Sequence, residues 1–206
     1  MFAEEALNTL LDKYEFETVL DVGSGNGDHS HYFHAAGKKV TAVDLKPLMS
    51  APFKTIAANY TDLVLSDCFD CIWLSHVLEH QLDTHSFLRK VHGNLKEGGV
   101  LAITVPPMKQ EIVGGHVSLW NMGLLLYRLI LAGFDCKEAI GKRYGYNISV
   151  IVRKQSIIID WATLRFDSGD IEILAQYFPI GRPWEQGFYG EFENINWHRH
   201  PLTPLP

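Results

Sequence analysis

The chain has 206 residues, 47% of them hydrophobic, with 18 Lys and Arg against 24 Asp and Glu. This length supports one sizeable core, and the apolar fraction excludes an intrinsically disordered chain. A net charge of −6 lacks the basic footprint of a nucleic-acid-binding protein, so we expect no nucleic-acid partner. Three cysteines are too few for a disulfide scaffold, and we expect Cys68 and Cys71 to be buried thiols of a cytoplasmic protein.

Strand-like apolar runs alternate with amphipathic runs along the first half of the chain. Strands are typically continuous and apolar where helices cover both faces of a parallel sheet, so this order predicts such a sheet. The expected helices span 3–13, 29–36 and 84–96, and the expected strands span 18–22, 39–43, 56–59, 71–75 and 100–105.

The second half begins with a predicted helix over 121–132. Two strand-like runs, 136–144 and 146–153, are separated only by Gly145 and predict an antiparallel hairpin at one sheet edge. A further helix is expected over 169–178. We therefore predict a mostly parallel α/β sheet with helices on both faces, an antiparallel hairpin at one edge and a C-terminal extension. The predicted core covers 1–153, and the extension, 154–206, packs on it as a candidate acceptor-binding part.

The most apolar segment of the sequence is 119–134. It is 16 residues long and contains Arg128. Because a bilayer-spanning helix needs about 20 apolar residues, we expect no transmembrane segment.

A glycine-rich loop, DVGSGNG at 21–27, lies between a predicted strand and a predicted helix. Glycines let a backbone turn tightly and approach a ligand, and the following helix N-terminus offers free N–H groups. Asp44 ends the next predicted strand, where a carboxylate suits the two hydroxyls of a ribose. The spacing differs from the G-x-G-x-x-G of nicotinamide-binding proteins because the third glycine, Gly27, comes one residue early.

The pattern D-x-G-x-G-x-G resembles the first motif of class I S-adenosylmethionine-dependent methyltransferases. The segments SHVLEH at 75–80 and LKEGGVL at 95–101 are similar to later motifs of that family, although Asn59 replaces a usual acid. The resemblance covers residues 1–153 and implies a doubly wound, Rossmann-like α/β sheet of about seven strands. It also implies S-adenosylmethionine as cofactor. It implies a cofactor site formed by Asp21, Gly23, Ser24, Gly25, Asn26, Gly27, Asp44, Leu45, Asn59, Tyr60, Ser75 and His76.

The acceptor of the methyl group is the less specific part of the resemblance. GGHVSLWN at 114–121, followed by the YGYNISV hairpin, looks similar to small bacterial methyltransferases of surface-glycan synthesis. A saccharide hydroxyl is therefore the expected acceptor, as a glycan or a small-molecule precursor. A hydroxyl acceptor benefits from a general base, and His80 and His116 are the candidate catalytic residues.

Aromatic residues are dense near the C-terminus, where they either stack on a sugar ring or pack the extension onto the sheet. Nearby glutamates are candidates for binding sugar hydroxyls. The aromatic residues are Tyr177, Phe178, Trp184, Phe188, Tyr189, Phe192 and Trp197, and the glutamates are Glu185, Glu191 and Glu193.

Three other interpretations of the chain remain open. A methyltransferase fold also serves acceptors with a carboxylate, a phenol or a lipid-like group, and it occurs as a non-catalytic binding module. Residues 76–80 spell H-x-x-E-H, a zinc-hydrolase motif that requires both histidines on one helical face. That segment follows a predicted strand, so we expect no metal site there. The spacing of His29, His31 and His34 converges poorly on a metal.

Overall fold

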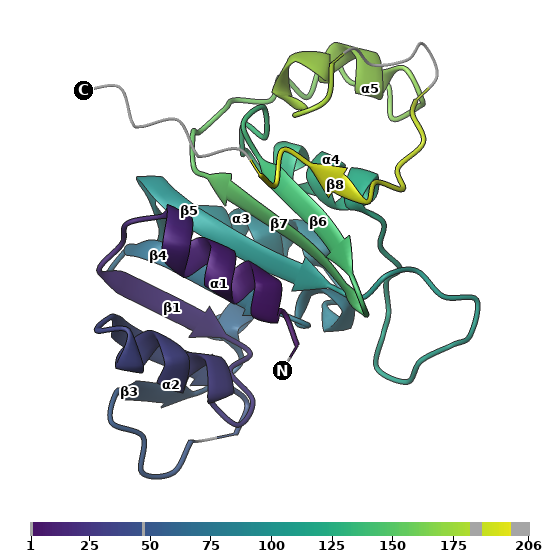
Figure 1. Ribbon diagram of the computed structural model, residues 1–206. Helices are drawn as coiled ribbons and strands as arrows, with labels where there is room; N and C mark the ends of the chain where they lie inside the picture. Colours follow the sequence, from purple (N-terminus) through teal and green to yellow (C-terminus); the bar gives the residue numbers. More distant parts are fainter. Residues whose placement is uncertain (1, 47, 182–186, 199–206) are drawn as a thin grey trace.

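The computed structural model describes residues 2–46, 48–181 and 187–198. One eight-stranded sheet runs through it in the order β3-β2-β1-β4-β5-β7-β6-β8 (Figure 1). The strands are β1 (Thr18–Val22), β2 (Lys39–Asp44), β3 (Lys54–Ala57), β4 (Phe69–Ser75), β5 (Leu95–Val105), β6 (Ile140–Tyr144), β7 (Asn147–Arg153) and β8 (Asn194–Ile195). The helices are α1 (Glu4–Lys13), α2 (Asp28–Ala35), α3 (Thr84–Asn94), α4 (Met122–Leu131) and α5 (Asp170–Ile173).

The predicted fold class is confirmed. Strands β1 to β5 pair in parallel, and the β6–β7 hairpin joins β5 in antiparallel fashion. The sheet has eight strands instead of about seven, because the short β8 pairs with β6 through Lys142 and Asn194. Two residues are too few for a period-2 pattern to emerge from sequence.

Side chains of the central strands point alternately to the two faces of the sheet and form two cores, one on each face. On β4, Cys71 and Trp73 pack with α1 and α2, whereas Ile72 and Leu74 pack with α3 and α4. Figure 1 shows α1 and α2 in front of the sheet and α3 and α4 behind it. Because every second residue faces the opposite layer, both faces need apolar side chains, which explains the continuous apolar runs.

The boundaries between α3 and β5 differ from the expected ones. The helix ends at Asn94 and β5 begins at Leu95, which pairs with Phe69 ahead of an irregularity in the ladder. Gly98 has φ +76°, and a Cβ on Gly99 would lie 2.9 Å from the Asp70 carbonyl oxygen. The two glycines therefore permit a bulge inside the strand where the sequence suggested a loop.

The C-terminal extension is less helical than expected. The predicted helix over 169–178 is replaced by α5 and a 3₁₀ turn at Ala175–Tyr177, separated by the buried Leu174. Side chains of the extension, among them Leu174 and Phe178, belong to the core that contains α4. The domain boundary at residue 153 stays a prediction.

Most aromatic side chains of the extension have packing partners. The Phe188 ring contacts Phe178 and Phe192, and Trp197 packs in the core beneath α1. Tyr189 is exposed, and Trp184 and Glu185 lie outside the described residues.

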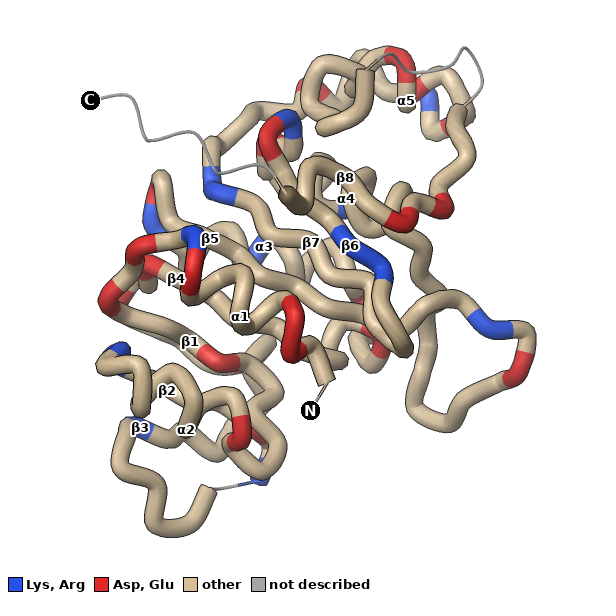
Figure 2. The backbone as a smooth tube through the Cα atoms, viewed as in Figure 1, with Lys and Arg blue, Asp and Glu red and all other residues tan. Residues whose placement is uncertain are grey.

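The nearby glutamates form ion pairs with the sheet. Arg143 lies 3.2 Å from Glu191 and 3.5 Å from Glu193, and Figure 2 shows the basic residues of β6 beside acidic residues leading to β8. The carboxylates of Glu191 and Glu193 therefore fasten the extension to β6, and binding of sugar hydroxyls by the extension stays a prediction.

Cys71 is buried as expected, but the expectation for Cys68 is wrong. Cys68 is exposed in the turn before β4, and it is a free thiol. Among the described residues, no helix is both long enough and apolar enough to cross a membrane.

The Asp21 carboxyl joins β1 to α2 inside the core. It is 1% exposed and accepts a 2.6 Å hydrogen bond from the Ser30 hydroxyl. Burial raises the pKa of Asp21 to about 7, the Ser30 hydrogen bond opposes the rise, and the charge of Asp44 adds to it. A carboxyl with a raised pKa binds its proton more tightly in the folded state, so its contribution to stability is lost as pH rises from about 4 through 7.

We predict that Asp21→Asn reduces the loss of stability between pH 5 and pH 8. The amide keeps an acceptor for Ser30 and cannot ionise, so the variant should gain roughly 1 kcal/mol or more relative to wild type over this range. Urea unfolding at both pH values measures the change. Asp12→Asn, at an exposed position of α1, is the control. If the stabilities of Asp21→Asn and wild type changed with pH by the same amount, the raised pKa of Asp21 would be contradicted.

Candidate active site

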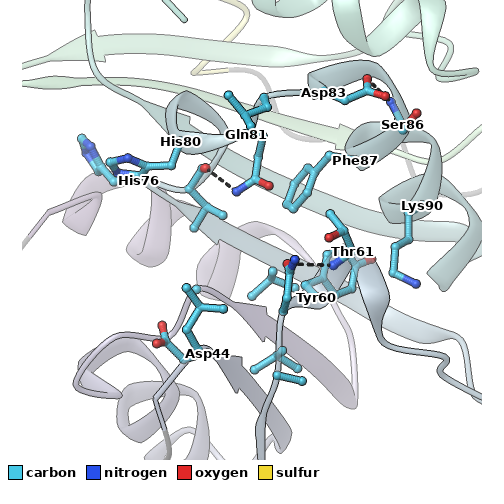
Figure 3. A pocket seen from close by; sticks show the side chains of 18 residues that line it. Asp44, Tyr60, Thr61, His76, His80, Gln81, Asp83, Ser86, Phe87 and Lys90 are labelled. Carbon is cyan, nitrogen blue, oxygen red and sulfur yellow. Dashed lines mark hydrogen bonds between the residues drawn. The ribbon is translucent and has the colours of Figure 1, made fainter. Parts of the chain in front are cut away.

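A cleft of about 830 Å³ opens at the carboxyl ends of the parallel strands. Chain order reverses between β1 and β4, which are neighbours in the sheet while β2 and β3 extend to one side and β5 to the other. Such a switch point leaves a crevice where ligands of open α/β sheets bind. The cleft is lined by Val22, Gly23, Val43, Asp44, Leu45, Ala58, Asn59, Tyr60, Thr61, His76, Val77, His80, Gln81, Leu82, Asp83, Ser86, Phe87 and Lys90 (Figure 3).

The glycine loop turns sharply at the end of β1. The backbone N–H groups of Gly23 and Ser24 both donate to the Val43 carbonyl, at 2.8 and 3.2 Å. Gly23 has φ +73°, and a Cβ there would lie 2.3 Å from Cγ2 of Val77. Glycine is therefore required at this position both by backbone conformation and by the close approach of the segment after β4.

Asp44 organises the same loop from the end of β2. Its two carboxylate oxygens accept from the backbone N–H groups of Gly25 at 2.9 Å and Lys46 at 3.1 Å. Each oxygen retains a further lone pair, so the carboxylate can also accept from ligand hydroxyls. Asp44 lies on the opposite side of the cleft from Gln81 and Phe87 (Figure 3).

The structure brings only part of the predicted cofactor set to the cleft wall. Gly23, Asp44, Leu45, Asn59, Tyr60 and His76 line it, as does the candidate base His80. Asp21 instead lies in the core bonded to Ser30, and Ser75 lies in β4. The other predicted residues that are not among the lining residues are Ser24, Gly25, Asn26 and Gly27 in the loop itself.

Asn59 and Tyr60 have local structural roles besides their place in the cleft. The Asn59 side chain caps the 3₁₀ turn Tyr60–Asp62, accepting from Thr61 N–H at 3.2 Å and donating to Asp62 at 3.0 Å. The buried Tyr60 ring packs edge-on against Phe87. Tyr60 therefore contributes mainly an aromatic wall to the cleft, and one lone pair of the Asn59 amide oxygen remains for a ligand.

His76, directly after β4, has both ring nitrogens close to oxygen acceptors. Its Nδ1 lies 3.3 Å from Glu79 Oε1, and its Nε2 lies 3.0 Å from Asn147 Oδ1, which also accepts from Ala3 N–H. Burial lowers the pKa of His76. The Glu79 carboxylate and the Asn147 amide oxygen raise it by more, so the pKa lies above its usual value. The residue also has φ +56°, a strained conformation that is common at functional sites.

The two candidate bases lie side by side, although they are far apart in sequence. The His80 and His116 rings are 5.1 Å apart in an edge-on arrangement. His80 lines the large cleft, whereas His116 lines an adjoining cleft of about 240 Å³. His80 Nδ1 donates to the Gly115 carbonyl at 2.8 Å, because a carbonyl only accepts, and this leaves Nε2 as the basic nitrogen of the neutral ring.

The zinc-hydrolase interpretation of H-x-x-E-H does not fit the local backbone. His76 is left-handed, and only Leu78–His80 forms a 3₁₀ turn, so the helical face that the motif requires is absent from this described segment. His76 Nε2 lies 3.0 Å from Asn147 Oδ1.

Several lining residues were missed by the sequence analysis. They lie in the turn after His80 and on α3, where Asp83 caps the helix through Ser86 N–H. In the sequence these residues look like the start of an ordinary capped amphipathic helix, and nothing in that pattern indicates that the N-terminal end of the helix faces a ligand. They are Gln81, Leu82, Asp83, Ser86, Phe87 and Lys90.

We predict that Gly23→Ala destabilises the fold by at least about 2 kcal/mol, because it combines an unfavourable φ with a steric overlap on Val77. Gly25→Ala is the matched control, since Gly25 has φ +54° but its Cβ would meet no atom within 4 Å. Chemical denaturation compares the two. Adding Val77→Ala to Gly23→Ala should restore part of the lost stability. Equal losses of stability in Gly23→Ala and Gly25→Ala would contradict the predicted steric overlap with Val77.

The sequence and the fold both have relatives among known proteins. Residues 20–103 match the family described as a methyltransferase domain. The malonyl-[acyl-carrier protein] O-methyltransferase of Salmonella typhimurium is 32% identical over 108 residues, which are 48% of this chain and 43% of that protein. The chain thus spans less than half the length of this curated relative.

Two solved structures have a similar fold. One is the 1,6-didemethyltoxoflavin-N1-methyltransferase of Burkholderia thailandensis with bound S-adenosylhomocysteine. Its TM-score is 0.64 at 21% identity, and the match covers 74% of this chain and 78% of that protein. The other is the N-methyltransferase NodS of Bradyrhizobium japonicum. Its TM-score is 0.61 at 15% identity, and the match covers 74% of this chain and 85% of that protein. Residues 20–103 are therefore similar to a methyltransferase domain, and the chain shares the Rossmann-like fold of these two solved methyltransferases.

Proposed function

We propose that the protein is an S-adenosylmethionine-dependent O-methyltransferase. The observation that carries the proposal is the cleft at the switch point, with the Gly23 turn on one strand end and the Asp44 carboxylate on the next. Its volume of about 830 Å³ is within the usual range for cofactor sites. Gly23, Asp44 and the amide of Asn59 would hold the cofactor, which supplies the methyl group as a sulfonium.

The acceptor that we propose carries a carboxylate, which replaces the saccharide hydroxyl expected from the sequence. The curated relative is named for O-methylation of a malonyl group on acyl-carrier protein, which is not a glycan. A malonyl group bound as a thioester has its free oxygens in a carboxylate. We therefore favour a small or carrier-bound carboxylic acid over a glycan precursor.

The electrostatics of the cleft support an anionic acceptor. His76 lines the cleft, and although burial lowers its pKa, Glu79 and Asn147 raise it above its usual value, which favours an anion nearby. A carboxylate is already ionised at neutral pH, and in-line attack on a methyl group requires alignment without removal of a proton. His80 and His116 are then needed to position the acceptor and not to act as a general base.

We place this reaction in the cytoplasm. The exposed, free Cys68 thiol supports a reducing compartment, where such thiols persist.

Calorimetric titration with S-adenosylhomocysteine tests the cofactor site. We expect micromolar binding by the wild type and a loss of at least about tenfold in Asp44→Ala, because the variant loses the carboxylate that suits ligand hydroxyls. Asp44→Asn should lose less, since its amide oxygen still accepts from Gly25 N–H. Asp12→Ala, on the opposite face of the sheet, is the control. Absence of binding by the wild type would overturn the proposed function.

The acceptor class is tested by incubating the protein with methyl-labelled cofactor and either a malonyl thioester or a set of sugars. Methyl esters of carboxylates release labelled methanol in mild alkali, whereas methyl ethers of hydroxyls do not. We expect the malonyl thioester to give a labelled product that releases methanol in mild alkali. Alkali-stable product from a sugar would restore the glycan interpretation, and tight cofactor binding without product from either would support a non-catalytic binding module.

A further inference from the structure

Glu79, His80 and His116 form a cluster of potential metal ligands at the boundary of the two clefts. One ligand atom from each residue lies within 4.8 Å of the others, and no other cluster of this kind occurs in the described part of the chain. Glu79 and His80 come from the 3₁₀ turn after β4, and His116 comes from the loop after β5.

The Glu79 carboxylate is the least satisfied group of the cluster. The side chain is 0% exposed, and neither carboxylate oxygen accepts a hydrogen bond of good geometry from the described residues. The nearest polar atoms are His76 Nδ1 at 3.3 Å and His80 Nε2 at 3.7 Å from Oε1. A buried carboxylate is costly unless it is paired or coordinates a metal, and here both imidazoles approach Oε1 while Oε2 has no hydrogen-bond partner among the described residues.

His80 is oriented as metal-binding histidines are. Its Nδ1–H donates to the Gly115 carbonyl at 2.8 Å, which fixes the ring and turns the Nε2 lone pair toward Glu79. Metal ligands of this type almost always donate their other N–H to a carbonyl or carboxylate. His76, close to Glu79 Oε1, supplies the corresponding outer contact to the carboxylate.

The loop that carries His116 is tied to the same turn. Val117 N–H donates to the Glu79 carbonyl at 2.8 Å, so His116 is held beside the 3₁₀ turn although β5 and α3 separate them in sequence. The ring is half-buried next to that of His80. A small shift of this loop therefore changes the distance from His116 to the other two ligands.

We infer that Glu79, His80 and His116 bind a divalent transition-metal ion of the Zn²⁺ class. Two imidazoles and a carboxylate suit such an ion better than Mg²⁺ or Ca²⁺, which prefer oxygen ligands. Tetrahedral Zn²⁺ with bonds of about 2.0–2.1 Å needs ligand atoms roughly 3.3 Å apart, so the cluster must contract by an ångström or so on binding. Three protein ligands leave one position open between the two clefts, for water or an oxygen of an acceptor.

The test is a titration of the full chain, stripped with a chelator, using Zn²⁺ by calorimetry and Co²⁺ by visible absorption. We expect one ion per chain and the intense visible bands of tetrahedral Co²⁺. Glu79→Gln and His116→Ala should each weaken binding by at least about 100-fold, because each removes a direct ligand. His34→Ala, which removes an exposed histidine of α2, should leave binding unchanged.

Urea unfolding of each variant separates loss of the metal site from loss of the fold. If Glu79→Gln unfolds, His116→Ala still decides, since its side chain lies on a loop. Less than one ion per chain, unchanged affinity in His116→Ala, or an equal loss in His34→Ala would overturn the metal site. Metal binding is measured without a cofactor or an acceptor, so failure of the proposed methyl transfer leaves this result interpretable.

Discussion

The close approach of two chain segments at the carboxyl end of the sheet determines the geometry of the site. Gly23 packs against Val77, and the same turn donates two backbone N–H groups to the Val43 carbonyl. The ends of β1, β2 and β4 are thereby held around one cleft. A side chain at position 23 would displace the segment that carries His76, Glu79 and His80, so the site depends on a contact that only glycine allows.

Two buried carboxyl groups near this end of the sheet have different surroundings and different consequences. Burial raises the pKa of Asp21 to about 7, and its hydrogen bond with Ser30 joins β1 to α2 in the core. Glu79 is surrounded by imidazoles and lacks a well-formed hydrogen bond. Because a group of this kind is stabilised by a positive charge, Glu79 links His76 to the inferred metal site.

The edge of the sheet supports the site from a distance. Asn147, at the start of β7, accepts from His76 and from Ala3 N–H, and Tyr146 stacks on the His76 ring. The hairpin therefore fixes the strained His76 conformation, and it ties the N-terminal helix to the cleft. Ion pairs between Arg143 and two glutamates attach the extension to the neighbouring strand. The antiparallel hairpin thus contributes to both the fold and the site.

The sequence by itself determined the order of the central strands and helices, the parallel sheet and the position of the glycine turn, because these follow from local periodicity and short motifs. The doubly wound arrangement followed from the family resemblance. It placed Asp44 correctly at the end of β2, whereas Asp21 proved to belong to the core. Tertiary structure alone decided the pairing of β8, the cap formed by Asn59 and the meeting of Glu79 with His116. These features arise from contacts between distant segments, and such contacts leave no periodic pattern along the chain.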